Sequence, residues 1–136
     1  MAPSKRTQKL LVAVVDDDAS MRDTTEDLLD SAGFRAATFA SAEAFLESPH
    51  RAKVSALIAD MLMPGMSGLA LHQQLASSGS PIPTILITAY PDDSVRARAL
   101  EVGVYCYLPK PYVAEELLAC VDGAITAGRQ RPTRGQ

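Results

Sequence analysis

The chain has 136 residues, of which 47% are hydrophobic and 21% are charged, and its formal net charge is −3. These values are typical of one soluble domain and exclude a second sizeable one. The acidic balance, the absence of Trp and an aromatic content of 5% argue against nucleic-acid binding by this segment. The longest apolar run, Leu10–Val15, is too short to span a bilayer and ends in aspartates, so we expect no membrane anchor and no signal peptide.

The two cysteines and two histidines form no metal-binding or disulfide pattern. Cys106 and Cys120 match no C-x-x-C or zinc spacing, and a domain of this length buries roughly two thirds of its surface without such supports. We therefore expect reduced core cysteines and a cytoplasmic protein. His50 and His72 have no second ligand at metal spacing, so we expect both on the solvated surface.

Short apolar runs alternate with segments of helical periodicity along the chain. The strand candidates are Leu11–Val15, Ala36–Phe39, Ser55–Ala59, Thr84–Ile87 and Tyr105–Leu108. Most of them lack polar alternation, which is typical of strands buried on both faces. Apolar residues at helical spacing predict a helix after each strand, within 21–32, 42–47, 71–75, 95–102 and 113–125.

Capping residues support these helix boundaries. Candidate N-caps are Ser41, Ser67 and Asp92, and candidate helix stops are Gly33, Gly79 and Gly103. The alternation predicts a (βα)5 α/β fold, a doubly wound parallel sheet with right-handed crossovers and three layers. We expect a folded domain over 10–127, a flexible segment over 1–9, and over 128–136 a flexible Arg-containing tail or the start of a linker.

Polar residues follow the predicted strands at one edge of the sheet. Asp16, Asp17 and Asp18 follow the first strand, Asp60 the third, and Thr88 and Lys110 the fourth and fifth. Ligands bind beyond the carboxyl ends of the strands in open parallel sheets, so this edge is the candidate site. Asp18 alone fits a helix N-cap. Each of the others also has a structural alternative: a strand residue for Thr88 and a surface residue for Lys110, whose backbone two prolines constrain.

The adjacent carboxylates Asp16 and Asp17 repel each other and need a cation or a basic partner. If the first and third strands are neighbours, about 4.8 Å apart, Asp17 and Asp60 can converge on one Mg²⁺ ion, with a main-chain carbonyl beyond Asp60 completing the set. Asp60 could then attack a phosphoryl group, while Lys110 and Thr88 stabilise its oxygens.

These residues resemble the receiver domain of two-component response regulators, over nearly all of Leu10–Ala127. The motifs that carry the resemblance are Val14-Val15-Asp16-Asp17-Asp18 with Met21-Arg22, Leu57 to Gly68, Ile87-Thr88-Ala89 and Lys110-Pro111. The aspartate triplet and the Met-Leu-Met-Pro-Gly-Met-Ser-Gly stretch most resemble those of receivers of the nitrogen-fixation type. The implied fold is the flavodoxin-like sheet in the order 2-1-3-4-5, for which a chemotaxis regulator is a known example.

The resemblance implies a role for each matching position. The matches are Asp60 with the phosphoacceptor, Asp17 with a direct Mg²⁺ (or Mn²⁺) ligand, Asp16 with a second acidic ligand, Leu62 with the main-chain metal ligand, Thr88 and Ala89 with the switch segment, Lys110 with the phosphate-binding lysine, Tyr107 with the switch aromatic, and Pro111 with the proline that follows the lysine through a cis bond. Pro109 departs from the pattern, and we expect it to end the last strand one residue early. Leu62 and Tyr90 are large, and we expect them to shield the phosphate from water.

The implied function is a phosphorylation-controlled switch and not a metabolic enzyme. A histidine kinase or a histidine phosphotransfer protein supplies the phosphoryl group, Thr88 moves toward it, and Tyr107 moves into the vacated space. The change biases the surface over 94–127, which controls an attached DNA-binding domain or a separate partner and could form a homodimer. Two alternatives remain open: a degenerate receiver that only binds proteins, and a haloacid-dehalogenase-type phosphatase, for which the chain lacks a cap and a second acidic pair.

Overall fold

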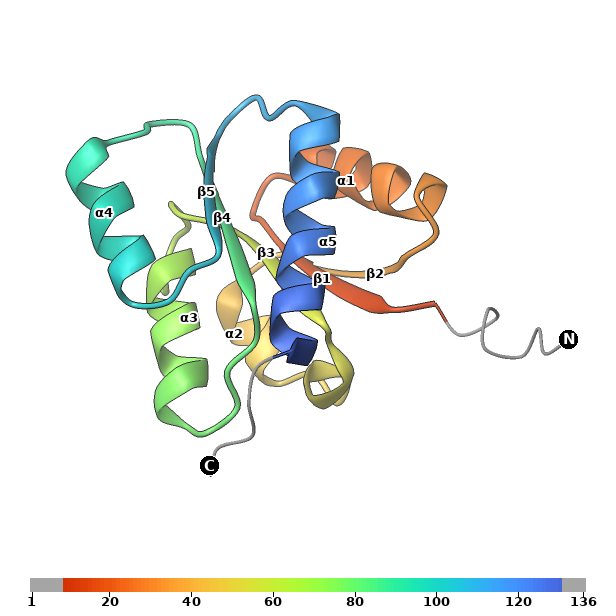
Figure 1. The fold of residues 1–136 in the computed structure, drawn as a ribbon, viewed down its shortest axis with the longest axis horizontal. Helices are drawn as coiled ribbons and strands as arrows, with labels where there is room; N and C mark the ends of the chain where they lie inside the picture. Colours follow the sequence, from red (N-terminus) through yellow and green to blue (C-terminus); the bar gives the residue numbers. More distant parts are fainter. Residues whose placement is uncertain (1–8, 131–136) are drawn as a thin grey trace, which may run out of the picture.

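A computed structural model describes residues 9–130, which form one parallel sheet flanked by helices (Figure 1). The strands are β1 (Leu11–Val15), β2 (Arg35–Phe39), β3 (Ala56–Asp60), β4 (Thr84–Thr88) and β5 (Cys106–Pro109). The helices are α1 (Ala19–Ser31), α2 (Ala42–Leu46), α3 (Gly68–Ser77), α4 (Asp93–Glu101) and α5 (Ala114–Gln130), with a 3-10 turn at Arg51–Lys53. The strand order β2-β1-β3-β4-β5 confirms the predicted (βα)5 sheet.

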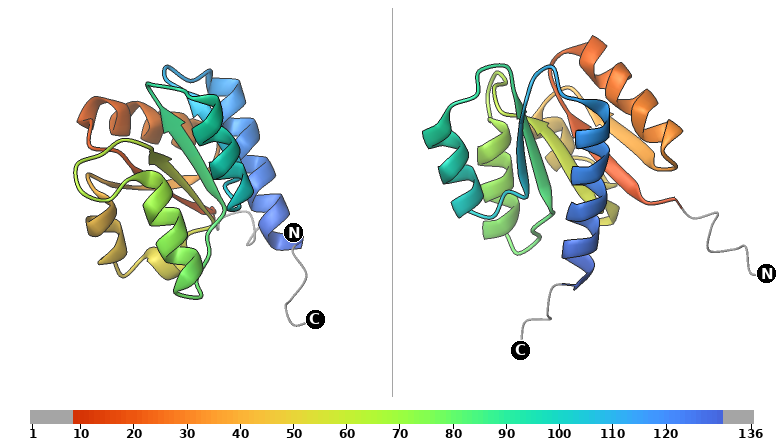
Figure 2. Two further views of the ribbon diagram at one scale, coloured as in Figure 1. Left: turned by 90° about the vertical axis from the view of Figure 1, so that its left-hand side faces the viewer. Right: turned by 45° about the horizontal axis from the view of Figure 1, so that its top comes forward.

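The helices cover both faces of the sheet and form three layers, as the two views of Figure 2 show. On one face, α2, α3 and α4 pack against the sheet around Phe45, Leu71 and Leu86. On the other face, α1 and α5 pack around Leu29 and Leu117. Two separate apolar cores therefore hold the central strands from both sides, which explains why β1, β3 and β4 are buried along their whole length.

The predicted helix caps are confirmed. The side chains of Asp18, Ser41, Ser67 and Asp92 each accept hydrogen bonds from backbone N–H groups in the first turn of the following helix. The predicted stops Gly33, Gly79 and Gly103 all adopt positive φ angles directly after α1, α3 and α4. These local signals mark the starts of α1 to α4 and the ends of α1, α3 and α4.

The last strand does not end early, contrary to the expectation for Pro109. β5 includes Pro109, which lies opposite Thr88. The donor to the Thr88 carbonyl is the backbone N–H of Lys110, at 2.7 Å, so the missing N–H of Pro109 removes no bond from this ladder. Because β5 lies at the edge of the sheet, a proline is tolerated there.

His72 is buried, so the prediction that it lies on the solvated surface was wrong. Its side chain in α3 is 5% exposed, Nδ1 shares a hydrogen bond of 2.9 Å with the Thr84 hydroxyl, and Nε2 donates to the Val102 carbonyl at 3.1 Å. A histidine whose two ring nitrogens are both hydrogen-bonded can be buried on the apolar face of a helix. The imidazole links α3, β4 and the end of α4. His50 is exposed, as predicted.

Both cysteines are free and partly buried against the α1 and α5 core. Burial, and then contact with the Cys120 thiol, raises the pKa of Cys106 to about 12. Cys106 therefore stays protonated at neutral pH, which favours a packing role.

α5 continues through Gln130, which is the last residue that the structure describes. The expected flexible ends, 1–9 and 128–136, lie mostly outside the described residues. Within 9–130, no helix has the length and apolar character to cross a bilayer.

Gly68 lets α3 approach the end of β3 closely. A Cβ atom at this position would lie 2.5 Å from the Asp60 carbonyl oxygen and 2.9 Å from Leu86 Cδ2. We expect Gly68→Ala to lower the free energy of unfolding by about 2 kcal/mol, because the backbone of α3 or β3 must shift. Urea unfolding measures this loss.

The matched control is Gly123→Ala in α5, where the atoms nearest to the added Cβ belong to the end of the Tyr105 side chain, which can move. An equal loss in both variants would show that the helix approach at Gly68 is not the constraint.

Candidate functional site

Three carboxylates converge at the carboxyl ends of β1 and β3. β1 and β3 are hydrogen-bonded neighbours, with Val15 opposite Ala59, so Asp16, Asp17 and Asp60 follow adjacent strand positions. Their ligand oxygens all lie within 4.8 Å of one another. Asp16 and Asp60 are only 4% and 7% exposed, whereas Asp17 faces solvent. The predicted convergence of Asp17 and Asp60 is thus present in the structure.

Lys110 places a positive charge between the two buried carboxylates. Its Nζ lies 3.0 Å from Asp60 Oδ2 and 3.1 Å from Asp16 Oδ2. Burial opposes the charged ammonium, but the hydrogen bonds to Asp60 and Asp16 outweigh it and raise the pKa of Lys110 above its usual value. Lys110 therefore reaches the site, and the peptide bond that follows it to Pro111 is cis, as the resemblance implies.

Backbone hydrogen bonds fix the orientation of each carboxylate. Asp16 Oδ1 accepts from the Asp18 N–H at 2.9 Å, and Asp60 Oδ1 accepts from the Leu62 N–H at 3.1 Å. The Arg22 guanidinium donates to the Asp16 carbonyl at 2.7 Å. Each buried carboxylate thus directs one oxygen to the backbone and the other to Lys110.

The ionised form of Asp16 is disfavoured in the folded protein. Burial raises its pKa above the usual value, the nearby charge of Asp60 adds to this, and the hydrogen bonds from Asp18 and Lys110 only partly oppose it. One lysine does not balance three carboxylates. The arrangement leaves negative charge and oxygen ligands at the solvent side, where Asp17 lies.

The oxygen ligands present are those of a hard divalent cation. Asp16, Asp17 and Asp60 supply carboxylate oxygens within one ion's reach, and no softer ligand belongs to the cluster in the described residues. The donor set fits Mg²⁺ or Mn²⁺. Leu62 lies in the loop directly after Asp60 with its side chain 53% exposed.

Thr88 lies at the end of β4, beside the acidic cluster. Its side chain is buried, and its hydroxyl accepts a hydrogen bond from the Tyr90 N–H at 3.0 Å. Ala89 and Tyr90 are exposed in the loop that leads to α4, with Tyr90 at 74%. A movement of the Thr88 hydroxyl would therefore change the backbone immediately before α4.

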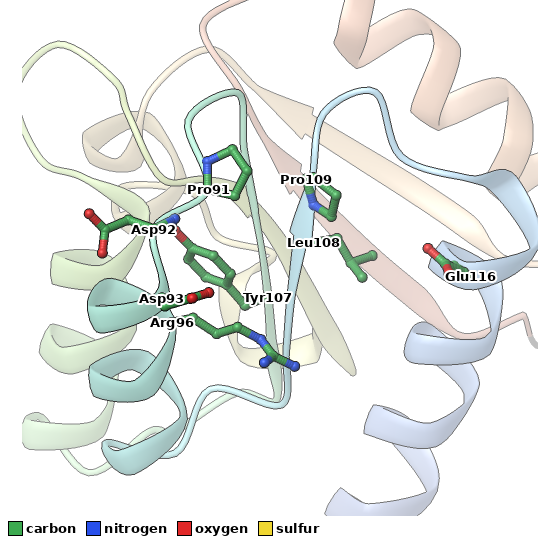
Figure 3. A pocket seen from close by; sticks show the side chains of 8 residues that line it. All are labelled: Pro91, Asp92, Asp93, Arg96, Tyr107, Leu108, Pro109 and Glu116. Atoms are coloured by element: carbon green, nitrogen blue, oxygen red, sulfur yellow. Dashed lines mark hydrogen bonds between the residues drawn. The ribbon is translucent and has the colours of Figure 1, made fainter.

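Tyr107 of β5 is already buried, with its hydroxyl accepting from the Asp92 N–H at 3.4 Å. Figure 3 shows the ring directed toward Asp92, at one side of a hollow of about 360 Å³ between α4, β5 and the start of α5. Arg96 and Glu116 line opposite sides of this hollow. The hollow lies on the surface expected to change with phosphorylation.

The sequence matches a known family over most of its length. The profile of the response regulator receiver domain covers residues 12–122, which include all the residues of the acidic site and Lys110. The chain belongs to the response regulator receiver family. The resemblance inferred from the sequence motifs is confirmed.

Curated relatives of this receiver include transcriptional regulators. The chain is 35% identical over 119 residues to the transcriptional regulatory protein FixJ of Bradyrhizobium diazoefficiens, covering 88% of this chain and 58% of that protein. It is 38% identical to the DNA-binding transcriptional regulator NtrC of Escherichia coli over 88% of this chain and 25% of that protein. The Nodulation protein W of B. diazoefficiens is 36% identical over 94% of this chain. FixJ and Nodulation protein W support the nitrogen-fixation-type subclass, and the receiver spans little more than half the length of either.

Solved structures give the same assignment. The response regulator StyR superposes with a TM-score of 0.83 at 40% identity, over 91% of this receiver and 63% of that chain. Full-length FixJ from B. japonicum gives a TM-score of 0.79 at 34% identity, over 90% of this receiver and 61% of that chain.

Three residues without a predicted site role make hydrogen bonds to other segments of the chain. Arg22 holds the Asp16 carbonyl, Glu43 in α2 accepts from the Met66 N–H at 3.3 Å, and Tyr112 contacts α1. Glu43 is 23 positions from Met66 and Tyr112 is 87 positions from its partner, so no local pattern could reveal these contacts. Arg22 lies in a recognised motif, and that was the available signal.

The raised pKa of Asp16 predicts a stabilising variant of the metal-free receiver. Because the protonated form is favoured in the folded protein, ionised Asp16 costs stability as the pH rises from the unfolded value of 3.8 through the higher folded one. We expect Asp16→Asn, at pH 7 with a chelator, to raise Tm by about 3 °C, or roughly 1 kcal/mol in a domain of this size.

Mg²⁺ is expected to raise the Tm of the unmodified receiver more than that of Asp16→Asn, and its effect is expected to weaken on acidification. Asp23→Asn, an exposed change on α1, is the control. A lower Tm for Asp16→Asn in chelator would show that its pairing with Lys110 outweighs its burial.

Proposed function

We propose that this receiver accepts a phosphoryl group on Asp60 from a phosphohistidine of a histidine kinase or phosphotransfer protein, and that the modification controls an output. The observation that carries the proposal is the ion pair of 3.0 Å between Lys110 and Asp60, beside two further carboxylates. A lysine in contact with a buried carboxylate can later contact a phosphoryl oxygen on that same carboxylate.

The proposed transfer forms one bond and breaks another. An Asp60 carboxylate oxygen attacks phosphorus as the P–N bond of the donor breaks, and the electron pair of that bond stays on the imidazole. The equatorial oxygens gain negative charge, which the Lys110 ammonium stabilises from the position it already occupies. The Thr88 hydroxyl, at the neighbouring strand end, is the expected further donor.

Asp16, Asp17, Asp60 and the main-chain oxygen of Leu62 are the proposed ligands of Mg²⁺ or Mn²⁺. When bound, the ion supplies positive charge that offsets the carboxylates and the phosphoryl oxygens. The exposed position of Asp17 leaves this side of the cluster accessible from solvent.

The proposed switch begins at Thr88. To donate to a phosphoryl oxygen, its hydroxyl moves away from the Tyr90 N–H, and the loop before α4 moves with it. α4 can move together with this loop because Ala99 is the one buried residue of the helix. The Tyr107 ring is already buried, so the proposed switch needs no further inward rotation of this side chain. The movement reaches the surface of α4, β5 and α5 through the loop before α4.

The proposed output is control of transcription, through an attached DNA-binding domain or a separate partner, since FixJ and NtrC are transcriptional regulators. The surface of α4, β5 and α5, which includes the hollow of Figure 3, is the proposed contact region, and it could also join two receivers. We propose that the protein acts in the cytoplasm and that its chemistry is limited to its own phosphorylation and dephosphorylation.

Phosphorylation at Asp60 is testable with acetyl phosphate, a small phosphoryl donor. We expect intact-mass measurement to show the gain of one phosphoryl group that requires Mg²⁺, that hydroxylamine removes, and that Asp60→Asn abolishes. Lys110→Met should slow labelling by about 100-fold, because one preorganised charge is lost from the transition state.

Lys53→Met is the matched control, since Lys53 is exposed on the 3-10 turn before β3, whereas Asp60 is the last residue of that strand. Failure of the receiver to be labelled, under conditions that label a known receiver, would favour a degenerate module that acts only by binding proteins.

Leu62 and Tyr90 are expected to lengthen the lifetime of the phosphoryl group. Both are large, apolar and mostly exposed in the loops that flank Asp60 and Thr88. Leu62→Asn combined with Tyr90→Glu should speed loss of the phosphoryl group several-fold, because polar side chains admit and orient water. The decay of labelled protein after donor removal measures the rate.

Leu100→Asn, a similar change on exposed α4, is the control and should leave the decay unaltered. An unchanged lifetime in the double variant would mean that these side chains do not shield the site.

A further inference from the structure

A hydrogen bond joins α1 to the loop that carries Lys110. The hydroxyl groups of Thr25 and Tyr112 lie 2.8 Å apart, although the residues are 87 positions apart in the sequence. Thr25 is buried in the middle of α1, and Tyr112 is half-buried between β5 and α5. The phenol ring also packs against the α1 and α5 core. The contact is thus a specific polar link within an otherwise apolar interface.

The loop from Lys110 to Val113 has few backbone restraints. The Lys110 N–H bonds to the Thr88 carbonyl at 2.7 Å, and the Val113 carbonyl accepts from Leu117 at 3.0 Å as α5 begins. Pro111 between them has no N–H. The hydrogen bond between the Tyr112 and Thr25 hydroxyl groups restrains the loop between the end of β5 and the start of α5.

α1 also holds the opposite side of the ion pair. Arg22 binds the Asp16 carbonyl, and Thr25 lies three positions later, on the same side of the helix. Asp16 and Lys110 are in turn joined at 3.1 Å. One turn of α1 therefore contacts the segments that carry both partners of a salt bridge in the acidic site.

We propose that Thr25 and Tyr112 are positioning residues for Lys110, which hold its ammonium at the distance from Asp60 that phosphoryl transfer requires. The inference rests on the proposed phosphorylation of Asp60. The hydroxyl pair acts by restricting the loop after Lys110, and neither hydroxyl touches the phosphoryl group. Small displacements of a charged group lower transfer rates strongly, whereas they affect donor binding less.

The test is a double-variant cycle with acetyl phosphate as donor. Tyr112→Phe and Thr25→Val each remove one hydroxyl with little change in shape. We expect each to lower the labelling rate at saturating donor by about fivefold, with the donor concentration for half-maximal rate unchanged. The double variant should be no slower than the slower single variant, because both changes break one contact. Thr25→Ser, which keeps the hydroxyl, should label at the rate of the unmodified receiver.

Tyr105→Phe is the matched control, because it removes a tyrosine hydroxyl from a side chain that packs over Gly123 of α5. It should leave the rate unchanged. Additive effects of Thr25→Val and Tyr112→Phe, or unchanged rates in both, would overturn the inference.

Amide hydrogen exchange tests the restraint without phosphorylation. Tyr112→Phe should speed exchange at the amides of Lys110, Tyr112 and Val113, while the buried β1 amide of Val14 reports any global loss of stability. Exchange that is unchanged at the loop, or faster to the same degree at Val14, would overturn the proposal. If the unmodified receiver takes no phosphoryl group, the proposed function fails, and the exchange measurement alone decides whether the restraint exists.

Discussion

The contact between one lysine and two buried carboxylates is the interaction on which this receiver depends. Asp16 and Asp60 are held at adjacent strand ends with little access to water, so their mutual repulsion is strong. Lys110 lies within 3.1 Å of both and reduces that repulsion, although it cannot balance the additional charge of Asp17. The same imbalance that makes the site costly to fold makes it suited to positive ions and to phosphoryl chemistry.

The rest of the fold divides into parts that fix this contact and parts that can respond to it. β1, β3 and β4 are packed from both faces, and backbone hydrogen bonds orient the Asp16 and Asp60 carboxylates. α4, in contrast, buries only Ala99 and begins just after the loop in which the Tyr90 N–H donates to the Thr88 hydroxyl. A rigid site beside a weakly packed helix is the arrangement that a small chemical change needs to alter a surface.

The strands and the edge where the acidic residues gather could be predicted because both follow from local patterns, whereas the strand order was implied only by the family resemblance. Apolar runs give the strands, and parallel strands place Asp17, Asp60 and Lys110 at one edge. His72 was misplaced because a histidine interrupts an apolar helical face, and only the distant Thr84 hydroxyl and Val102 carbonyl satisfy it. The effect of Pro109 was overestimated because the ladder bond belongs to the next residue. The Thr25 and Tyr112 contact depends on tertiary packing, which no spacing rule encodes.

The direction of α5 limits how the proposed phosphorylation can act along this helix. The helix begins beside the loop that carries Lys110 and ends at the opposite edge of the sheet (Figure 1). Its 17 residues, at 1.5 Å each, span about 25 Å. The two ends of α5 are therefore separated by well over a Debye length, the distance over which a charge is screened at physiological salt. The proposed phosphorylation would therefore act on the far end of α5 through shifts of packed helices, and not through direct attraction between charges.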